Sequence, residues 1–363
     1  MTLADDLSIA PVTLRAGIGD LSPRRNAAWT PPTLIVTADP EHGVTTYARQ
    51  LAEQVRLVLP HTAVRGPRLE VSPIGAPGWV HVHFTDRLWG ADALSAAAAV
   101  EALAADYRVI VTLHDVPQYS DGTNLARRAE CYRRVIAAAA AVVCNSEHEA
   151  ELLREFTSAH AAPAVIPLPV QTTAPLPVPE HLDGAVAILG FVYPGKGHER
   201  AIDAASLVAV RPGVVHGRPR VVALGRASAG HEGDVDALRV SAHERGVSFE
   251  VTGYLSDDEL VRRARHVSVP VIAHDHVSAS GSLASWISAG RRPIVVRSRY
   301  MEEMAALRPG TVTLVDAVDF VDAVAAALQN PESTWLHSAV DVRPTTRDTV
   351  DQYLEYWQAV MSA

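Results

Sequence analysis

The chain has 363 residues, enough for two domains of ordinary size rather than one. Hydrophobic residues make up 48 % and charged residues 20 %, a balance that is normal for a globular protein with buried cores. The net charge of −9 and the lack of a basic run exclude bulk electrostatic attraction to nucleic acid.

The cellular context is predicted from the cysteines and from the apolar runs. Cys131 and Cys144 have neither the spacing of a metal site nor that of a disulfide framework, so they suit a reducing compartment. No apolar stretch approaches the roughly 20 residues of a membrane helix, and residues 1–30 contain no signal-peptide core. We therefore expect a cytoplasmic protein whose residues 1–30 form a loose arm.

Two runs of alternating strands and helices follow this arm. In the first, residues 31–168, strands are predicted at 33–37, 79–84, 109–113, 141–144 and 164–166, and helices at 44–57, 91–105 and 147–156. Strands that alternate with helices form parallel sheets covered on both faces. The run therefore predicts an N-terminal Rossmann-like domain, on the acceptor side of the molecule.

A proline-rich stretch separates the two runs. Five prolines between residues 167 and 179 exclude a buried helix or strand, and residues 169–184 are predicted as an extended linker. The second run, residues 185–345, contains predicted strands at 185–189, 220–224, 248–252, 267–272, 293–296 and 311–315. It predicts a C-terminal Rossmann-like domain on the donor side.

The last segment, residues 346–363, carries a predicted helix over 349–361. Its aromatic residues Tyr353, Tyr356 and Trp357 form an apolar face, which we expect to pack back on the N-terminal domain. The predicted fold is therefore α/β, with two Rossmann-like domains whose parallel sheets face each other across a cleft. Ligands of such sheets bind at the carboxyl ends of the strands.

Lys196 is the single lysine among 32 basic residues. An arginine bias fits a GC-rich genome, but a compact ammonium fits against a phosphate in a tight loop where the broad guanidinium does not. The lysine lies in a Pro194-Gly195-Lys196-Gly197 loop that opens a predicted helix, which resembles a phosphate cradle in its logic. It is not a Walker A motif, because glycine follows the lysine. Chance retention of one surface lysine is the alternative, and either way we expect its replacement to leave folding almost unaffected.

Polar residues follow two strands of the first run. His114 and Asp115 come directly after the strand at 109–113, where a side chain can hydrogen-bond a sugar hydroxyl or orient a carboxylate. A purely structural histidine is the alternative. His81 and His83 alternate on one strand and so share a face, but no third ligand is evident and no metal is predicted.

Two further loops open helices. Gly43, in the loop at 39–44, would let a ligand approach the backbone at a helix N-terminus, although a simple strand–helix turn is the alternative. Ser280, Gly281 and Ser282 offer hydroxyl and N–H groups that suit a diphosphate, although an ordinary N-cap is the alternative.

The motifs, and their order along the chain, resemble those of retaining glycosyltransferase family 4, which has the GT-B fold. The resemblance rests on residues 42–51, 112–115, 142–147, 165–170, 193–197, 251–260 and 281–290. It implies that Lys196 binds the diphosphate of a nucleotide-sugar donor, that His114 contacts the donor sugar, and that residues 253–255 flank the base. The implied donor-binding residues are Gly43, Gly195, Arg226, Gly253, Tyr254, Leu255, Asp275, His276, Ser280, Gly281, Ser282, Leu283 and Ser285; those on the acceptor side are His42, His83 and Asp115.

The chain departs from the family pattern at three positions. Phe191 stands where the family has an arginine five residues before the lysine, and we expect Arg226 to replace that arginine. Val277 and Ser285 stand where the family has two glutamates. Ser285 can still bond a ribose hydroxyl, and Asp275 or His276 is expected to substitute for the other glutamate.

The resemblance predicts a hexosyltransferase that moves a sugar from a nucleotide-diphosphate sugar to a glycan, lipid or small-molecule acceptor. It implies retention of configuration and no metal or other cofactor. The expected partners are the donor and the acceptor and no nucleic acid, while peripheral membrane contact and the oligomeric state stay open. The alternatives are a non-catalytic GT-B binding or scaffold protein and a sugar-nucleotide epimerase of the same architecture.

Overall fold

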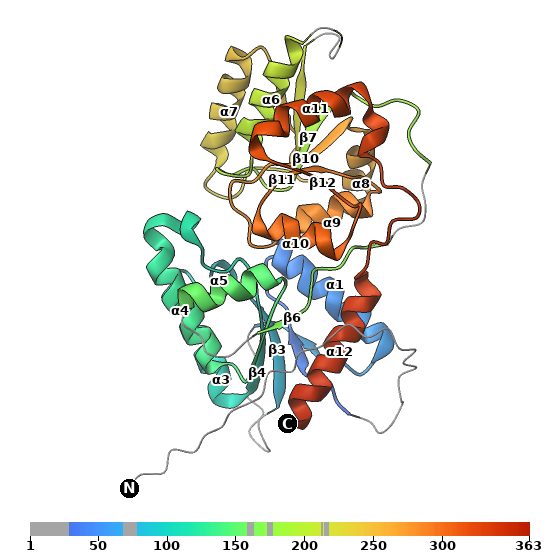
Figure 1. Ribbon diagram of the computed structural model, residues 1–363. Coiled ribbons are helices and arrows are strands. Elements are labelled where there is room, and N and C mark those ends of the chain that lie inside the picture. The colour runs from blue at the N-terminus through green and yellow to red at the C-terminus, as the bar shows by residue number, and fades with distance from the viewer. Residues whose placement is uncertain (1–28, 68–77, 158–162, 173–176, 212, 214–217) are drawn as a thin grey trace. The chain divides into compact units, whose positions relative to one another are not determined.

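The computed structural model describes residues 29–67, 78–157, 163–172, 177–211, 213 and 218–363. The predicted arm therefore lies almost wholly outside the described residues. The contacts divide the chain into two units, which are described separately (Figure 1). Unit 1 comprises Met1–Asn145, Ala150–Ile166 and Tyr353–Ala363, and unit 2 comprises Ser146–Glu149 and Pro167–Gln352.

Unit 1 is built on a six-stranded parallel sheet in the order β2-β1-β3-β4-β5-β6. Its strands are β1 (Thr33–Ile35), β2 (Val64–Arg65), β3 (Trp79–Phe84), β4 (Arg108–Leu113), β5 (Ala141–Cys144) and β6 (Ala164–Val165). Its helices are α1 (Gly43–Val58), α2 (Asp86–Trp89), α3 (Ala93–Asp106), η1 (Tyr119–Asn124), α4 (Leu125–Ala138), most of α5 (Glu147–Thr157) and the end of α12 (Thr346–Ser362).

Helices cover both faces of this sheet, which is why its central strands β3 and β4 are almost entirely buried. Residues of α3, α4 and α5 pack on one face through Val100, Tyr132 and Leu153. The other face is covered by α1 and by the end of α12 (Figure 1), where Tyr353 and Trp357 are fully buried.

Unit 2 is built on a second six-stranded parallel sheet in the order β12-β11-β10-β7-β8-β9. Its strands are β7 (Ala185–Leu189), β8 (Arg220–Leu224), β9 (Ser248–Val251), β10 (Val269–Ile272), β11 (Ile294–Val296) and β12 (Thr313–Val315). Its helices are α6 (His198–Ala209), α7 (Glu232–Glu244), α8 (Asp257–His266), α9 (Gly281–Ser288), α10 (Arg299–Leu307), α11 (Phe320–Gln329), η2 (Ala317–Asp319), η3 (Pro331–Thr334) and the start of α12.

The strand order of unit 2 reverses between β7 and β10. Counted along this unit the order is 3-2-1-4-5-6, that of the dinucleotide-binding Rossmann fold. Helices α6, α7 and α11 cover one face of the sheet, and α8, α9 and α10 cover the other (Figure 1). Ligands of such sheets bind outside the carboxyl ends of the strands at the reversal, so the loops after β7 and β10 are placed to form a site.

The proline-rich stretch is held by unit 2 where it is described. The backbone N–H of Val170 donates to the carbonyl of Pro344, and Arg308 donates to the carbonyl of Leu168. Arg265 donates to the carbonyl of Pro177.

The predicted α/β fold with two parallel sheets is confirmed, and β3, β5, β7 and β8 span the residues predicted for them. Two boundaries differ for identifiable reasons. β10 begins at Val269 rather than 267, because the carbonyls of Val267 and Ser268 accept hydrogen bonds from the buried Arg291 side chain. The sequence predicts a helix over 284–289, whereas α9 begins at Gly281 because Ser280 caps it.

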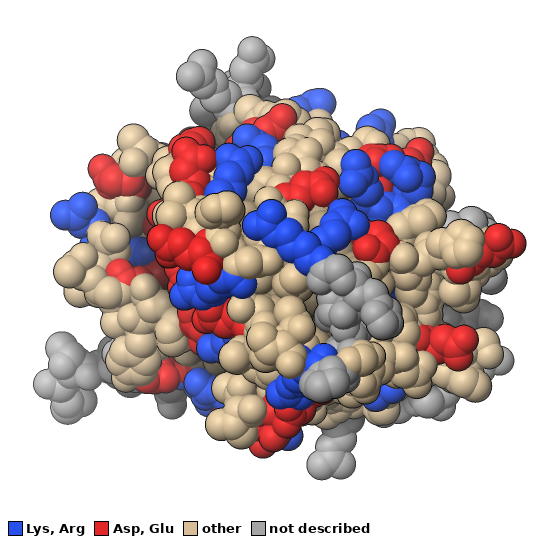
Figure 2. All heavy atoms as spheres, turned by 90° about the horizontal axis from the view of Figure 1, so that it is seen from above, with Lys and Arg blue, Asp and Glu red and all other residues tan. Residues whose placement is uncertain are grey.

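Surface features agree with the composition. Basic and acidic side chains are interspersed over the face seen in Figure 2, so that face offers no extended basic area to a nucleic acid. Within the described ranges, no helix combines the length and apolar character that a bilayer-spanning segment needs.

Candidate functional site

The loop between β7 and α6 lies against the segment that follows β10. Gly197 has a φ of +96°, and a Cβ added there would lie 2.3 Å from the carbonyl oxygen of Ala273, so only glycine fits. The N–H of Asp275 donates to the carbonyl of Gly195 at 2.9 Å. These contacts bring together the two loops at the reversal of strand order.

Lys196 is buried within this junction, with 7 % of its surface exposed. Its ammonium donates to the hydroxyl of Ser282 at 3.1 Å and lies 5.7 Å from the ring centre of Tyr193. No carboxylate pairs with it among the residues that the structure describes, and burial lowers the pKa of Lys196 to about 8. A buried ammonium with one hydroxyl partner retains donors for an anion.

The N-terminus of α9 lies directly beside this ammonium. Ser280 caps the helix by accepting from the N–H of Leu283 at 3.2 Å, and its hydroxyl also contacts that of Ser282. The N–H groups of Gly281 and Ser282 donate to no group in the described part of the chain, and a Cβ at Gly281 would meet nothing within 4 Å. A cation, hydroxyl groups and N–H donors therefore converge on one place, as an anion site requires.

Two histidines near Lys196 were not singled out by the sequence. His198 and His274 are buried, and neither ring nitrogen of His198 has a hydrogen-bond partner in the described residues. Burial and, secondarily, the charge of Lys196 lower the pKa of His198 to about 3 and that of His274 well below its usual range. Both rings are therefore neutral at pH 7. The sequence signal that could have identified them was their position, since His198 directly follows Gly197 and His274 directly precedes Asp275.

Arg226, which is expected to replace the arginine of the family, lies after β8. The residues predicted to flank the base, 253–255, lie after β9. The guanidinium carbon of Arg226 is 5.3 Å from the ring centre of Phe191, so this arginine lies over the position where the family has its own. The N–H of Gly253 donates to the carbonyl of Gly225 at 2.9 Å. The ring of Tyr254 is exposed, and Leu255 is half-buried against the core.

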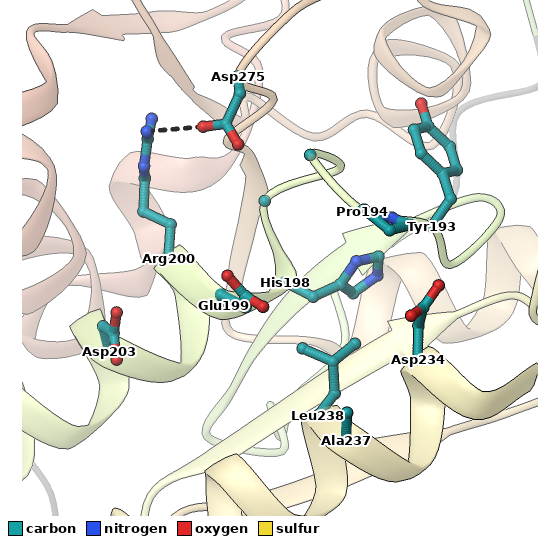
Figure 3. Close-up of a pocket in the computed structure, with 12 residues that line it drawn as sticks. Tyr193, Pro194, His198, Glu199, Arg200, Asp203, Asp234, Ala237, Leu238 and Asp275 are labelled. Atoms are coloured by element: carbon teal, nitrogen blue, oxygen red, sulfur yellow. Dashed lines mark hydrogen bonds and ion pairs between the residues drawn. The ribbon is translucent and has the colours of Figure 1, made fainter. Parts of the chain in front are cut away.

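A cavity of about 300 Å³ opens beside the lysine loop between α6 and α7 (Figure 3). Asp275 and Arg200 form an ion pair of 2.9 Å at one side of it, and the ring of His198 lies between Pro194 and Leu238. Of the predicted donor residues, this cavity includes Gly195 and Asp275 but not Tyr254, Gly281, Ser282 or Ser285.

The remaining predicted donor residues are placed as follows. The hydroxyl of Ser285 donates to the carbonyl of Gly281 at 3.1 Å, within α9. The side chain of Leu283 is buried in the core, so only its backbone can take part in a site. His276 is exposed and makes no side-chain hydrogen bond in the described part of the chain. Asp275 is thus the better placed of the two expected substitutes for the glutamate.

In unit 1, His114 and His83 form a buried pair at the carboxyl ends of β4 and β3. Their Nε2 and Nδ1 atoms are 3.0 Å apart, and the rings are stacked with a 27° interplanar angle. Burial holds the pKa of each histidine well below its usual value, with smaller contributions from His81 to His83 and from His83 to His114. Each ring is therefore neutral, with one nitrogen as donor and the other as acceptor.

The other predicted residues of unit 1 begin a helix or follow a strand. His42 caps α1 by accepting from the N–H of Val44 at 3.2 Å, and Gly43 is the first residue of that helix. A Cβ at Gly43 would meet nothing within 4 Å, so its backbone is open to a ligand. Asp115 follows His114 in a left-handed conformation, with a φ of +49°.

His81 shares a face of β3 with His83 but is engaged elsewhere. Its Nε2 atom lies 2.8 Å from the hydroxyl of Thr112, and burial lowers the pKa of His81 to about 3. The structure contains, within its described ranges, no group of three or more histidine, cysteine, aspartate or glutamate side chains arranged to hold a metal.

The fold and the site define a class of protein. Each of the two units is built on a six-stranded parallel sheet with helices on both faces, which is the fold of the solved glycosyltransferases compared below. Residues 75–174 match the model of Glycosyltransferase Family 4. The predicted resemblance to this family is thereby confirmed over this segment, and the chain has the fold of GT-B glycosyltransferases.

Solved structures share this fold at low sequence identity. The chain is similar to HepE from Anabaena, solved in complex with UDP and glucose, with a TM-score of 0.61 and 13 % identity over 91 % of this chain and 98 % of that one. It is also similar to sucrose-phosphate synthase from Thermosynechococcus elongatus, with a TM-score of 0.60 and 15 % identity over 91 % and 96 % of the two chains. No curated protein matches the chain in sequence.

Proposed function

We propose that the protein transfers a sugar from a nucleotide-diphosphate sugar to an acceptor hydroxyl, with retention of configuration and without a metal. The observation that carries this proposal is the ammonium of Lys196, which is buried, hydrogen-bonded to Ser282 at 3.1 Å and unpaired with any carboxylate in the described residues. Burying a charge without a counter-charge is costly, and a diphosphate would offset that cost. HepE, which shares the fold, has been solved with UDP-glucose.

The chemistry follows from where negative charge develops. When the bond between the anomeric carbon and the diphosphate oxygen breaks, its electron pair stays on the diphosphate. An acceptor hydroxyl then bonds to the anomeric carbon and gives its proton to the departing diphosphate oxygen. Lys196 and the N–H groups of Gly281 and Ser282 would stabilise the departing diphosphate more strongly than the intact donor. These groups supply positive charge that a metal provides elsewhere, which supports metal independence.

A thermal-shift panel of UDP-, GDP- and TDP-sugars tests the proposal. A ligand at 100 times its dissociation constant stabilises the folded state by about 2.7 kcal/mol, so the true donor should raise the melting temperature. The shift should persist in EDTA and should be lost in Lys196→Met, which keeps the volume and removes the charge. If no nucleotide sugar stabilises the wild-type protein, or if Lys196→Met responds as the wild type does, the assignment of the donor site is wrong.

A non-catalytic sugar-nucleotide-binding protein is a second candidate, because Phe191 and Val277 lack the functional groups that the family has at these positions. The two candidates differ in turnover. A transferase releases free nucleoside diphosphate from its donor, whereas a binding protein shows the thermal shift without release. The anomeric proton coupling of the product, measured by NMR, then reports whether configuration is retained.

A further inference from the structure

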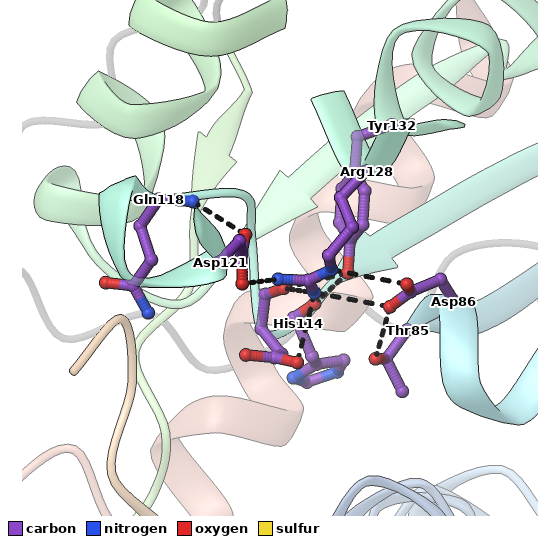
Figure 4. Close-up of polar contacts among 8 residues, drawn as sticks. Thr85, Asp86, His114, Gln118, Asp121, Arg128 and Tyr132 are labelled. Carbon is purple, nitrogen blue, oxygen red and sulfur yellow. Dashed lines mark hydrogen bonds and ion pairs between the residues drawn. The ribbon is translucent and has the colours of Figure 1, made fainter. Parts of the chain in front are cut away.

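The segment His114–Asp115 is held in a conformation that a non-glycine residue rarely adopts. Asp115 has a φ of +49°, in the left-handed region, which costs about 1 kcal/mol or more outside glycine and persists only where neighbours enforce it. Two side chains of α4, Arg128 and Tyr132, enforce it here (Figure 4). Neither belongs to the family motifs.

Tyr132 bonds the backbone of this segment. Its fully buried hydroxyl lies 2.6 Å from the carbonyl oxygen of His114 and 3.0 Å from that of Asp115. A carbonyl rotated into the ordinary helical or extended conformation would lose this partner. The hydroxyl therefore fixes the two peptide groups that orient both side chains.

Arg128 bonds the same segment and connects it to two other elements. Its guanidinium donates to the backbone carbonyl and to the carboxylate of Asp115, the latter at 3.1 Å. It also binds Asp86 of α2 through two bonds of 3.2 Å each, and Asp121 of η1 at 2.6 Å. With five N–H donors in a planar fork, arginine makes these five bonds to three carboxylates and a carbonyl at once, which the three donors of an ammonium cannot.

Exposure distinguishes the three carboxylates. The side chains of Asp86 and Asp121 are 11 % and 15 % exposed, whereas that of Asp115 is 50 % exposed. Two of the aspartates thus anchor Arg128, and the third is held by it at the surface, next to the His83–His114 pair. A network that only stabilised the core would not need a strained, half-exposed member.

We propose that Arg128 and Tyr132 are positioning residues that fix the Asp115 carboxylate and the His114 ring for the transfer reaction. The expected effect on turnover rests on the proposed function. The fixed positions of Asp115 and His114 rest only on the contacts described within unit 1. A displacement of about 1 Å in a reacting group can lower turnover by about 100-fold, so loss of the clamp should act mainly on kcat.

Tyr132→Phe is the first test, because it removes the hydroxyl and leaves charge and volume unchanged. Its matched control is Tyr356→Phe, since the hydroxyl of Tyr356 donates at 3.2 Å to the carbonyl of Val142, in the same unit, and not to the backbone of His114 or Asp115. The assay measures UDP release from UDP-glucose with water as acceptor. We expect Tyr132→Phe to lower kcat by about 10- to 100-fold with little change in the KM for UDP-glucose, and Tyr356→Phe to match the wild type.

A spectroscopic measurement separates this proposal from the function on which it rests. The imidazole 15N signals of His114, assigned with His114→Gln, should move in Tyr132→Phe and stay in place in Tyr356→Phe. Arg128→Lys should show the same shifts, while Arg133→Lys, an exposed arginine of α4 paired with Glu130, should not.

The outcomes are distinct. If the His114 signals do not respond to Tyr132→Phe, or respond while kcat stays at the wild-type value, the positioning role is wrong. If the wild-type protein neither binds nor cleaves UDP-glucose, the proposed function loses its support with this donor. The NMR comparison still decides whether the clamp fixes the histidine.

Discussion

The side chain of Lys196 lies in the interior of unit 2, although the sequence places it in a glycine-rich loop. Its neighbours explain this position. Gly190 leaves room for the ammonium, since a Cβ there would be 3.4 Å from it, and the N-terminus of α9 supplies the hydroxyl that it bonds. The composition singled out Lys196 as the one lysine of the chain. Its burial could not be predicted, because it depends on a contact with Ser282, 86 residues away.

Replacement of Lys196 should affect turnover strongly. We expect Lys196→Ala to lower kcat by about two to three orders of magnitude, as loss of other oxyanion donors does. Lys196→Arg should also be impaired, because the guanidinium is too broad for the space beside Gly190. Steady-state release of UDP from the identified donor measures both. Arg239→Ala, which removes an exposed ion pair of α7, is the control, and full turnover in Lys196→Ala would show that the lysine has no role.

The lowered pKa of Lys196 also predicts how stability depends on pH. Its usual pKa of 10.5 falls to about 8 in the folded protein, so the unfolded chain binds more protons between these values. The free energy of unfolding should therefore rise with pH from about 8 to 10.5, by a contribution on the order of 3 kcal/mol. Below pH 8 the buried charge is a net cost, so we expect Lys196→Met to be more stable than the wild type there, whereas the sequence alone predicts almost no effect on folding.

Urea denaturation of both proteins from pH 7 to 10.5 measures this contribution as a difference, which cancels the other titrating groups. The chain has no second lysine to complicate the comparison. A difference that stays constant across the range would mean that the pKa of Lys196 is not lowered by burial.

The residues that sequence reasoning missed share a physical reason. Arg128 bonds Asp86, 42 residues away, and Tyr132 bonds the backbone of His114, 18 residues away, and no local pattern encodes these contacts. Residues that follow a strand directly, such as His114, could be selected because the edge of a parallel sheet is where its ligands bind.

At the scale of elements, the sequence located β3, β5, β7 and β8 to the residue, whereas β10, α3 and α12 begin two or three residues away from their predicted starts. Continuous apolar runs such as β7 and β8 have sharp ends because both faces are buried. Helix ends depend on caps, and some caps come from far away. The end of α8 is the clearest case, since Arg291 donates to its carbonyls at Ala264 and Arg265 from 27 and 26 residues later.

Arg291 should therefore be a major determinant of stability in unit 2. It is fully buried, bonds four further groups at Val267, Ser268 and Thr334, and lies 4.4 Å over the ring of Trp335. Arg291→Lys keeps the charge but leaves carbonyls unpaired, and we expect a loss of about 3 kcal/mol or more. Arg292→Lys, at a partly exposed neighbour with a single 3.3 Å bond to Val312, should cost far less. Chemical denaturation compares the two, and equal losses would contradict the role of Arg291.

At the scale of the whole molecule, the sequence was sufficient for the class of fold and for the number of sheets. The order of motifs along the chain carried this information, because each motif follows a strand of a repeating strand–helix unit. The strand order itself, with its reversal between β7 and β10, was not readable, since pairing between distant strands leaves no local trace. That reversal brings the lysine loop and α9 together.

The C-terminal residues Tyr353–Ala363 belong to unit 1, whereas the residues that precede them, Pro167–Gln352, belong to unit 2. Trp357 is fully buried there, with its ring 5.3 Å from that of His81 on β3 and 5.6 Å from that of Tyr353. Trp357→Ala should destabilise unit 1 by about 3–5 kcal/mol, the cost of a large cavity in a core. Trp286, equally buried in α9 of unit 2, provides the reciprocal variant.

Hydrogen exchange followed by mass spectrometry resolves the two units within one molecule. Trp357→Ala should speed exchange in β3 and β4 and leave β7 and β8 protected, while Trp286→Ala should do the reverse. This pattern is expected because Trp286 packs in the core of unit 2 and Trp357 packs against His81 of unit 1. If either variant speeds exchange equally in both sheets, the two units unfold as one cooperative body, and α12 then joins their stabilities rather than completing unit 1 alone.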